Sequence, residues 1–292
     1  MWWTSPEVAR SRPKSRGRLD SKTRPERVGC PVTYVPQGMD SVLQFHVVPD
    51  LPMIKADDDL AALLLAGLGR LAVTLQDGDI LVLAQKIVSK AEGRLIPLAT
   101  VTASARAIEL ARETDKDPRL VQLILDESSE VMRKRPGMLI MRHRLGNVGA
   151  HAGIDQSNIE HAGGECALLL PIDPDASAQR LRQTVQAATG RRVGVIIADS
   201  MNRAWRLGTI GGAIGCAGVK VLDDLRGTPD LYGRELKVTI INRVDSLAAT
   251  ACLLMGESVQ KTPAVLIQGL PFEDSRQTAR DLVRPLAEDL FR

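Results

Sequence analysis

The chain has 292 residues, with 38 Lys or Arg against 35 Asp or Glu, so its formal net charge is +3. This balance excludes a strongly cationic nucleic-acid-binding protein, and a content of 44% apolar and 25% charged residues is typical of a globular domain. No apolar run reaches the length of a membrane span, no signal-peptide core follows Met1, and the four cysteines form no CxxC pair, so we expect a reduced, cytoplasmic protein.

The first 30 residues differ in composition from the rest of the chain. They carry eight Lys or Arg, three Asp or Glu and three prolines, with few aliphatic residues. Such a segment cannot bury enough apolar surface to offset the entropy of ordering. We therefore predict a basic, disordered extension over residues 1–40 and a folded domain over residues 41–292. The alternatives are an arm that binds nucleic acid or an anionic surface, or a true start at a later methionine such as Met39.

Hydrophobic patterning predicts the first elements of the folded part. Alternation over residues 42–48 predicts a strand that ends before Pro49. The acidic run at residues 57–59 precedes an apolar stretch, which predicts a helix that begins at Leu60. An apolar run over residues 80–88 follows an Asp-Gly-Asp turn and predicts a buried strand.

The remaining pattern mixes helices and strands without strict alternation. Asp117 and Pro118 predict the start of a helix whose apolar positions extend to Val131 and which ends at Pro136 and Gly137. The mixture and the absence of a fixed repeat indicate an α+β fold with a mixed sheet. Further strands are predicted over residues 138–141, 193–198, 237–242 and 264–268, and further helices over residues 171–189 and 247–255.

Polar segments beside predicted strands are the first candidates for a functional site. Residues 88–94 come at the end of a predicted strand and suit a phosphate or carboxylate, although a solvated turn has the same composition. Residues 149–158 are rich in small residues, so a ligand can approach the backbone closely there. Asp155 and Asn158 are spaced to face one ligand, although a lone aspartate in such a stretch is also typical of a turn.

The strand predicted over residues 193–198 leads to Asp199 and Ser200. A carboxylate and a hydroxyl at a strand end offer the oxygen ligands that Mg²⁺ and Mn²⁺ prefer, while a helix cap is the alternative role. Arg203 and Arg206 flank a tryptophan, and guanidinium groups bind phosphate or carboxylate in a bidentate manner. No dinucleotide-binding glycine motif, HExxH zinc motif or GxSxG elbow is present.

Other histidines and glycines are interpreted as structural. We expect His143 to be a surface residue at the end of a strand. Gly215 and Gly218 are expected to permit close packing rather than ligand binding. His151 is the only histidine inside a candidate segment.

Several collinear motifs together carry a family resemblance. They are Leu-Pro-Met-Ile at 51–54, Ala-Gln-Lys-Ile-Val-Ser-Lys-Ala-Glu-Gly-Arg at 84–94, Ala-Gly-Ile-Asp-Gln-Ser-Asn at 152–158, Leu-Pro-Ile-Asp-Pro-Asp-Ala-Ser at 170–177, Asp-Ser at 199–200, Arg-Ala-Trp-Arg at 203–206, Ala-Ile-Gly-Cys-Ala-Gly at 213–218, Asp-Leu-Arg-Gly-Thr-Pro-Asp at 224–230, Gly-Arg at 233–234, Met-Gly at 255–256 and Ala-Arg-Asp-Leu-Val-Arg-Pro at 279–285. In this order the chain resembles the coenzyme F-420:L-glutamate ligase family from about residue 42 to its end.

The resemblance implies a reaction and an assembly. GTP would activate a carboxylate of the deazaflavin coenzyme F-420 precursor as an acyl phosphate, and the amine of L-glutamate would displace phosphate to form a gamma-glutamyl amide. It also implies a two-lobed fold, an intertwined homodimer, two divalent ions (Mg²⁺ or Mn²⁺) and a response to K⁺. Neither a nucleic acid nor a membrane is among the implied partners.

The resemblance also assigns residues to roles. It implies that Asp155 and Asp199 bind one divalent ion and that Ser200 and Glu257 bind the second. We expect Lys90, Arg203 and Arg206 to act on the reacting phosphate or carboxylate, because phosphoryl transfer depends on charge neutralisation and positioning. The implied contacts of the guanine nucleotide are Leu51, Pro52, Met53, Ile54, Gln85, Lys86, Lys90, Asn158, Met255, Gly256, Glu257, Ser258, Val259, Gln260, Lys261 and Thr262.

The chain departs from the pattern of the family in four places. His151 replaces a usual Asn, residues 200–202 (Ser-Met-Asn) replace Thr-Phe-Gly, Glu257 replaces a common Gln, and residues 245–246 (Asp-Ser) replace Asp-Glu. The nucleotide and metal positions keep suitable side chains through these changes. The alternative that they leave open is an amide ligase of the same family with a different acceptor acid or amine. A non-catalytic phosphate-binding protein is a further alternative.

Overall fold

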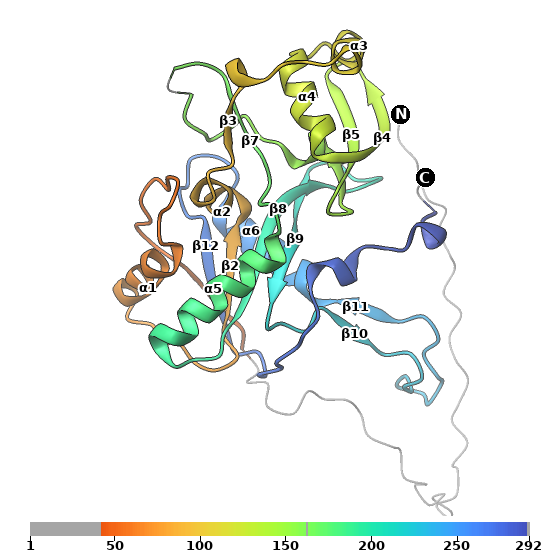
Figure 1. The fold of residues 1–292 in the computed structure, drawn as a ribbon. Helices are drawn as coiled ribbons and strands as arrows, with labels where there is room; N and C mark the ends of the chain where they lie inside the picture. The colour runs from red at the N-terminus through yellow and green to blue at the C-terminus, as the bar shows by residue number, and fades with distance from the viewer. Residues whose placement is uncertain (1–41, 162, 291–292) are drawn as a thin grey trace, which may run out of the picture. The chain divides into compact units, whose positions relative to one another are not determined.

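The computed structural model describes residues 42–161 and 163–290, so the predicted extension over residues 1–40 lies outside the described residues. A five-stranded mixed sheet forms the centre of the folded unit (Figure 1). Its strands β2 and β8 are parallel neighbours, and the other pairings within it are antiparallel. The strands lie in the order β1 (Gln44–Val47), β12 (Ala264–Gln268), β2 (Ile80–Ala84), β8 (Gly194–Asn202) and β9 (Thr209–Ala217).

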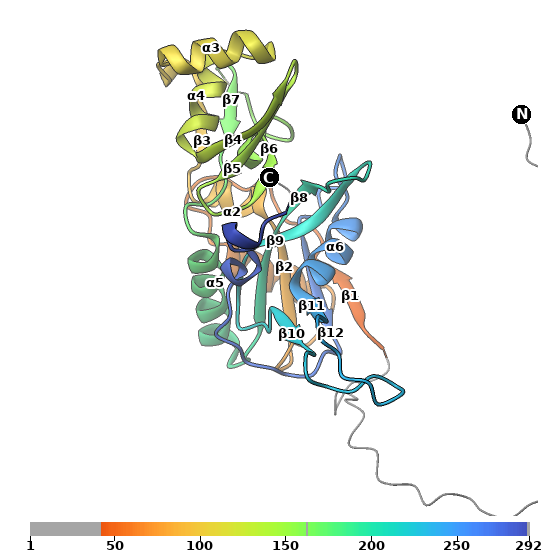
Figure 2. The ribbon, with the colours of Figure 1, turned by 90° about the vertical axis from the view of Figure 1, so that its right-hand side faces the viewer.

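Both faces of this sheet are covered by helices. Alternate side chains of a strand point to opposite faces, so Leu81 of β2 joins one apolar cluster while Val82 joins another. Figures 1 and 2 show α5 and α6 on opposite sides of the sheet. Strands that are buried on both faces have nearly continuous apolar sequences, which is why the pattern predicted β2 and β8. The covering helices are α1 (Leu60–Arg70), α5 (Pro174–Thr189) and α6 (Arg243–Met255).

The predicted start of α1 at Leu60 is confirmed by its cap, whereas α5 begins three residues later and α6 four residues earlier than predicted. The side chain of Asp59 accepts a hydrogen bond from the amide of Ala62 at 3.1 Å, as expected for the start of α1. Asp173 caps α5 in the same way, through the amide of Ala176 at 3.0 Å. Helix α5 ends at Gly190, whose φ of +72° explains why a glycine stands there.

The strand predicted over residues 80–88 is wrong in its second half. β2 ends at Ala84, and helix α2 (Gln85–Ala91) follows without a loop. Gln85, Val88 and Ser89 are buried in α2 at helical spacing, and the Ser89 hydroxyl donates to the Gln85 side chain at 2.9 Å. A short apolar run cannot distinguish a buried strand from a buried helix turn, so the pattern extended the strand too far. Residues 88–94 therefore do not follow a strand.

A second group of elements has a separate apolar core. Helices α3 (Ala105–Thr114) and α4 (Pro118–Asp126) pack on a three-stranded antiparallel sheet that contains Leu139 and Met141. The predicted extension of the α4 helix to Val131 is wrong, because the chain turns at Glu127 and Val131 lies in β4; helix α3 was not predicted. The strands of the three-stranded sheet are β4 (Ser128–Arg135), β5 (Met138–His143) and β6 (Val148–Ala150). A separate pair consists of β3 (Leu95–Pro97) and β7 (Cys166–Leu168).

One buried carboxylate joins α2 to this second core. Glu127 is 5% exposed, and it receives the guanidinium groups of Arg94 and Arg144, each at 3.0 Å. His143 contacts the same carboxylate at 3.3 Å and is itself buried, so its prediction as a surface residue is wrong. Its place at the end of β5 was predicted, but the alternation of burial along β5 breaks at that end. We refer to Glu127, Arg94, His143 and Arg144 as the Glu127 network.

Close packing explains the two glycines interpreted as structural. A Cβ on Gly215 of β9 would lie 2.4 Å from the backbone of Pro174, and a Cβ on Gly218 would lie 2.2 Å from Arg182. Beyond β9 the chain forms the two-stranded ribbon of β10 (Leu222–Asp224) and β11 (Ile240–Asn242), visible in Figure 2. Among the residues that the structure describes, no helix has the length and apolarity needed to cross a membrane.

Candidate active site

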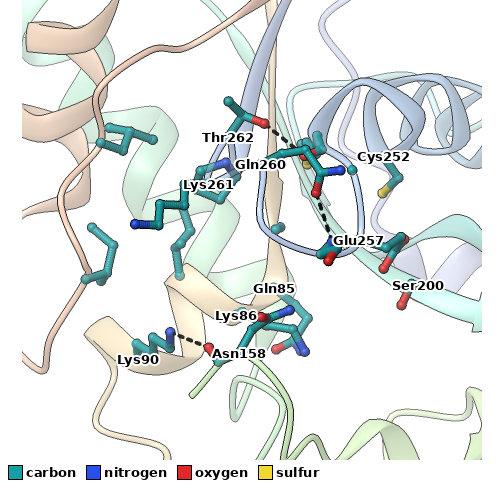
Figure 3. A pocket seen from close by; sticks show the side chains of 18 of the residues that line it. Gln85, Lys86, Lys90, Asn158, Ser200, Cys252, Glu257, Gln260, Lys261 and Thr262 are labelled. Carbon is teal, nitrogen blue, oxygen red and sulfur yellow. Dashed lines mark hydrogen bonds between the residues drawn. The ribbon is translucent and has the colours of Figure 1, made fainter. Parts of the chain in front are cut away.

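A cavity of about 620 Å³ opens beside the carboxyl ends of the parallel strands β2 and β8 (Figure 3). Ligands of open α/β sheets bind at this edge, because the loops that follow parallel strands meet there. Five separate chain segments line the cavity: residues 51–54, 84–90, 158–160, 198–200 and 252–263. Every residue to which the sequence assigned a nucleotide contact is among its lining residues. That these residues bind a nucleotide stays a prediction.

Three lysines bring positive charge to this cavity. Lys86 and Lys90 come from α2, and Lys261 comes from the loop after α6; Figure 3 shows all three around the same hollow. The ammonium group of Lys90 donates to the backbone carbonyl of Asn158 at 2.9 Å. Burial and the neighbouring charge of Lys86 lower the pKa of Lys90, while Glu160 opposes the shift. An anionic ligand would relieve this repulsion.

Carboxylates oppose the lysines at one side of the cavity. Burial first, and then the charges of Asp155 and Glu257, raise the pKa of Asp199 to about 7. Asp155 does not line the cavity, but it contacts two residues that do. Its carboxylate contacts the ammonium group of Lys86 and accepts a hydrogen bond from the Gln85 side chain at 3.3 Å. The backbone of Asp155 pairs with Leu168 in an isolated β-bridge, which fixes its position. We refer to Asp155, Asp199 and Glu257 as the acidic cluster.

Known proteins resemble this chain over most of its length. The family model described as F420-0:Gamma-glutamyl ligase matches residues 50–269. Coenzyme F420:L-glutamate ligase of Methanothermobacter thermautotrophicus is 43% identical over 84% of this chain and 97% of its own length. Its counterparts from Archaeoglobus fulgidus and Methanocaldococcus jannaschii are also 43% identical, over 84% and 75% of this chain and over 94% and 86% of their own lengths.

This chain belongs to the F420-0:gamma-glutamyl ligase family. The match covers all five segments that line the cavity, since they lie between residues 51 and 263. Residues 1–49 and 270–292 lie outside the matched part of the family model.

The acidic cluster offers the chemistry of a divalent-cation site. Asp155, Asp199, Ser200 and Glu257, the predicted ligands, all present oxygen, which Mg²⁺ and Mn²⁺ prefer. Within the described ranges, no three His, Cys, Asp or Glu side chains converge closely enough to hold an ion. The cation that stands against Asp155 is instead Lys86. The chemistry of the donor set fits the ions that the family resemblance implies, and ion binding at these residues stays a prediction.

The structure does not bring the two predicted arginines to the cavity. Arg203 and Arg206 are exposed in the loop between β8 and β9, and neither is among the cavity-lining residues. Trp205 between them is 88% exposed and adopts a φ of +64°, so this loop presents an aromatic ring between two guanidinium groups. A role in catalysis for these arginines stays a prediction.

Sequence reasoning missed the turn that precedes Asp155. His151, Ala152 and Gly153 all have positive φ, at +52°, +55° and +71°, so three consecutive residues are left-handed. Only glycine adopts this conformation without a steric cost, and the single Gly in the segment was its only visible signal. Sequence reasoning also missed Glu160 and Cys252, which line the cavity but carry no recognisable motif.

Proposed function

We propose that this chain is a GTP-dependent ligase that adds L-glutamate to the precursor of coenzyme F-420, as the names of its relatives indicate for them. One observation carries the proposal: the predicted nucleotide contacts come from separate segments and line one cavity together with Asp199, Ser200 and Glu257. A volume of about 620 Å³ suits a ligand of nucleotide size.

The proposed chemistry assigns a task to each wall of the cavity. Residues 51–54 form a largely apolar wall for the base, and Lys86, Lys90 and Lys261 provide positive charge for the phosphates. The acceptor carboxylate attacks the γ-phosphorus and GDP leaves; the glutamate amine then attacks the acyl carbon, and phosphate and a proton leave. Two divalent ions, one held by Asp155 and Asp199 and the other by Ser200 and Glu257, would supply charge neutralisation to the transferred phosphoryl group. We propose that Arg203 and Arg206 bind the acceptor's phosphate or carboxylate groups.

Mass spectrometry tests this function directly. The full chain is incubated with GTP, Mn²⁺, L-glutamate and the unglutamylated coenzyme, with ATP replacing GTP in a parallel reaction. We expect a product heavier by one or more glutamyl units and an equal amount of GDP. Lys90→Gln is the matched variant, because it removes one cavity charge without touching the acidic cluster. Absence of a heavier product together with absence of thermal protection by GTP would contradict the proposal.

A second candidate is an amide ligase with another acceptor acid or amine. Met201 and Asn202, which replace the family's usual Phe-Gly, line a small recess of about 60 Å³ on which Asp199 and Ser200 also border. Acceptor selectivity is therefore the property that these replacements would change most. A competition assay with a panel of acids and amines distinguishes the two candidates. The second candidate predicts GDP release with an acid other than the coenzyme.

We further propose a two-lobed homodimer whose activity responds to K⁺. Support for two lobes comes from the separate apolar core under α3 and α4. Support for association comes from large hydrophobic side chains that are exposed to solvent. At least 85% exposed are Leu207 in the β8–β9 loop and Leu231, Tyr232 and Val238 near the β10–β11 ribbon. Light scattering during gel filtration measures the mass of the assembly, and a monomer at micromolar concentration would contradict it.

A further inference from the structure

The contact between Lys86 and Asp155 lies at the boundary between the cavity and the acidic cluster. Lys86 stands in the first turn of α2 and lines the cavity, whereas Asp155 lies behind it. The side chains of the pair are 27% and 31% exposed, so the pair is accessible to a ligand and is not locked inside the core. The Gln85 amide donates to the same oxygen, Asp155 Oδ2, at 3.3 Å. One face of the Asp155 carboxylate is therefore occupied by groups from α2.

Charge around this pair is not balanced. Asp155 and Glu257 both act on Asp199, and Lys86 is the cation that opposes them there. The oxygen side chains of Asp155, Asp199 and Glu257 are of the kind that divalent cations prefer. The Lys86 ammonium group contacts Oδ2 of Asp155, which is one of the two predicted ligands of the first ion. Lys86 and such an ion would therefore compete for one carboxylate.

The cavity offers Lys86 a second partner. Lys90 and Lys261 line the same hollow, and the backbone carbonyl of Asn158 already receives Lys90. A polyphosphate in this hollow would attract the ammonium groups, and Lys86 is the one whose departure would uncover a carboxylate. The four-carbon stem of a lysine is flexible, which favours such a transfer by side-chain rotation.

We infer that Lys86 is a resident counter-ion, which blocks the cation position at Asp155 until a nucleotide phosphate draws its ammonium group into the cavity. The inference rests on the proposed function in one respect, namely that the cavity ligand is a nucleotide. Its consequence is that nucleotide and divalent ion bind cooperatively, and the coupling is reciprocal. The order of addition follows: the nucleotide binds first or together with the ion, and the ion alone binds weakly.

Mn²⁺ binding without nucleotide is the decisive measurement, because phosphate oxygens chelate Mn²⁺ themselves and would produce coupling in any protein. The full chain is treated with EDTA and dialysed, and free Mn²⁺ is followed by its electron paramagnetic resonance signal. For Lys86→Gln we expect about tenfold tighter Mn²⁺ binding than for the wild type, since the competitor is removed. Lys90→Gln is the matched control from the same helix, and it should leave Mn²⁺ binding unchanged. Lys86→Arg keeps the charge and should bind Mn²⁺ as weakly as the wild type.

GDP then measures the coupling. Its addition should tighten Mn²⁺ binding strongly in the wild type and much less in Lys86→Gln, while Lys90→Gln should weaken GDP binding alone. Unchanged or weaker Mn²⁺ binding by a folded Lys86→Gln, or no Mn²⁺ binding by any variant, would overturn the inference. The nucleotide-free result does not depend on ligase turnover, so failure of the proposed function and failure of this inference remain distinguishable.

Discussion

Two groups of ionisable side chains within the folded unit have opposite electrostatics. In the Glu127 network, one carboxylate meets two guanidinium groups and a histidine. Burial alone would raise the pKa of Glu127, but His143, Arg94 and Arg144 together hold it below its ordinary value. In the acidic cluster, carboxylates outnumber the lysine that faces them, and burial with like charges raises the pKa of Asp199 to about 7.

The comparison separates a structural network from a functional one. A buried charge that is fully paired leaves no charge for a ligand to neutralise, and its role is to hold elements of the fold together. A cluster with surplus charge of one sign costs stability, and such a cost is typical of sites that await a ligand of the opposite sign. Position agrees with this distinction, because the Glu127 network joins α2 to the second core whereas the acidic cluster borders an open cavity.

Asp199→Asn should give the largest effect and tests the functional side of the comparison. We expect turnover to fall by about 10³-fold, because the variant lacks a proposed ligand of the divalent ion and loses several kcal/mol of charge stabilisation in the transition state. In EDTA at pH 8 the variant should melt at a higher temperature than the wild type. The folded-state pKa is raised, so ionisation at pH 8 opposes folding, and Asn removes that penalty while it can still accept from the Ser200 amide. A lower melting temperature would place Asp199 among the structural carboxylates.

Glu127→Gln tests the structural side. Removal of the Glu127 charge leaves the guanidinium groups of Arg94 and Arg144 without their shared, buried counter-ion, and we expect a loss of about 3 kcal/mol in the free energy of unfolding. Turnover per folded molecule should stay near that of the wild type, which separates this variant from Asp199→Asn. Urea titration at pH 7 measures the loss, and equal stability of variant and wild type would remove the network from the structural class.

The pH dependence of stability offers a second test of the Glu127 network. Because the folded-state pKa of Glu127 is lowered, its contribution is complete above the unfolded value near 4.5 and is lost as pH falls through the folded value. Urea titrations between pH 6 and pH 3 should therefore show a smaller decline for Glu127→Gln than for the wild type. An identical decline in both would show that other carboxylates carry the acid sensitivity.

His151→Asn should stabilise the protein slightly, whereas Glu127→Gln should destabilise it. Asn tolerates left-handed backbone better than most residues, so we expect a gain of about 0.5 kcal/mol where His151 has a φ of +52°. His161→Asn is the control: that ring accepts from the Cys166 amide at 3.1 Å outside the turn, and its loss should not stabilise the protein. If His151→Asn destabilises the protein instead, the partly buried ring contributes more to packing than the backbone loses in strain.

Deletion of residues 1–38 should give the smallest effect. The composition of this segment predicts no packed core, and the acidic cluster and the Glu127 network are defined by residues beyond position 93. Turnover and melting temperature of the shortened chain should equal those of the full chain. A substantial loss of either would favour the alternative that this arm has a binding role.

The sequence predicted the main helices and strands and the residues that line the cavity better than it predicted the contacts between them. Caps such as Asp59 and Asp173 act through neighbouring backbone amides, so their effect is visible locally. The break between β2 and α2 at Gln85 depends on burial of that side chain against distant segments, and no local pattern shows it. The same holds for His143, whose burial follows from a carboxylate 16 residues earlier in the chain.

The site shows the same limit. Asp155 and Lys86 were both selected, but from different motifs and for different ligands, and their direct contact joins positions 69 residues apart. The left-handed turn before Asp155 was not predicted, since Ala at its second position rarely adopts positive φ and a lone His beside it is too weak a signal. Residue types indicate which ligand is suited to a site, whereas contacts between segments determine which groups compete within it.

The position of β12 has a consequence for the timing of folding. This strand, residues Ala264–Gln268, lies between β1 and β2, so two of the earliest strands of the sheet are joined only by one of the last segments to be synthesised. A nascent chain that stops before Ala264 lacks the strand that connects β1 to β2, and the cavity wall that precedes it is not anchored in the sheet. Pairings of such long sequence separation form slowly, so the cavity should form only when synthesis is nearly complete rather than in stages.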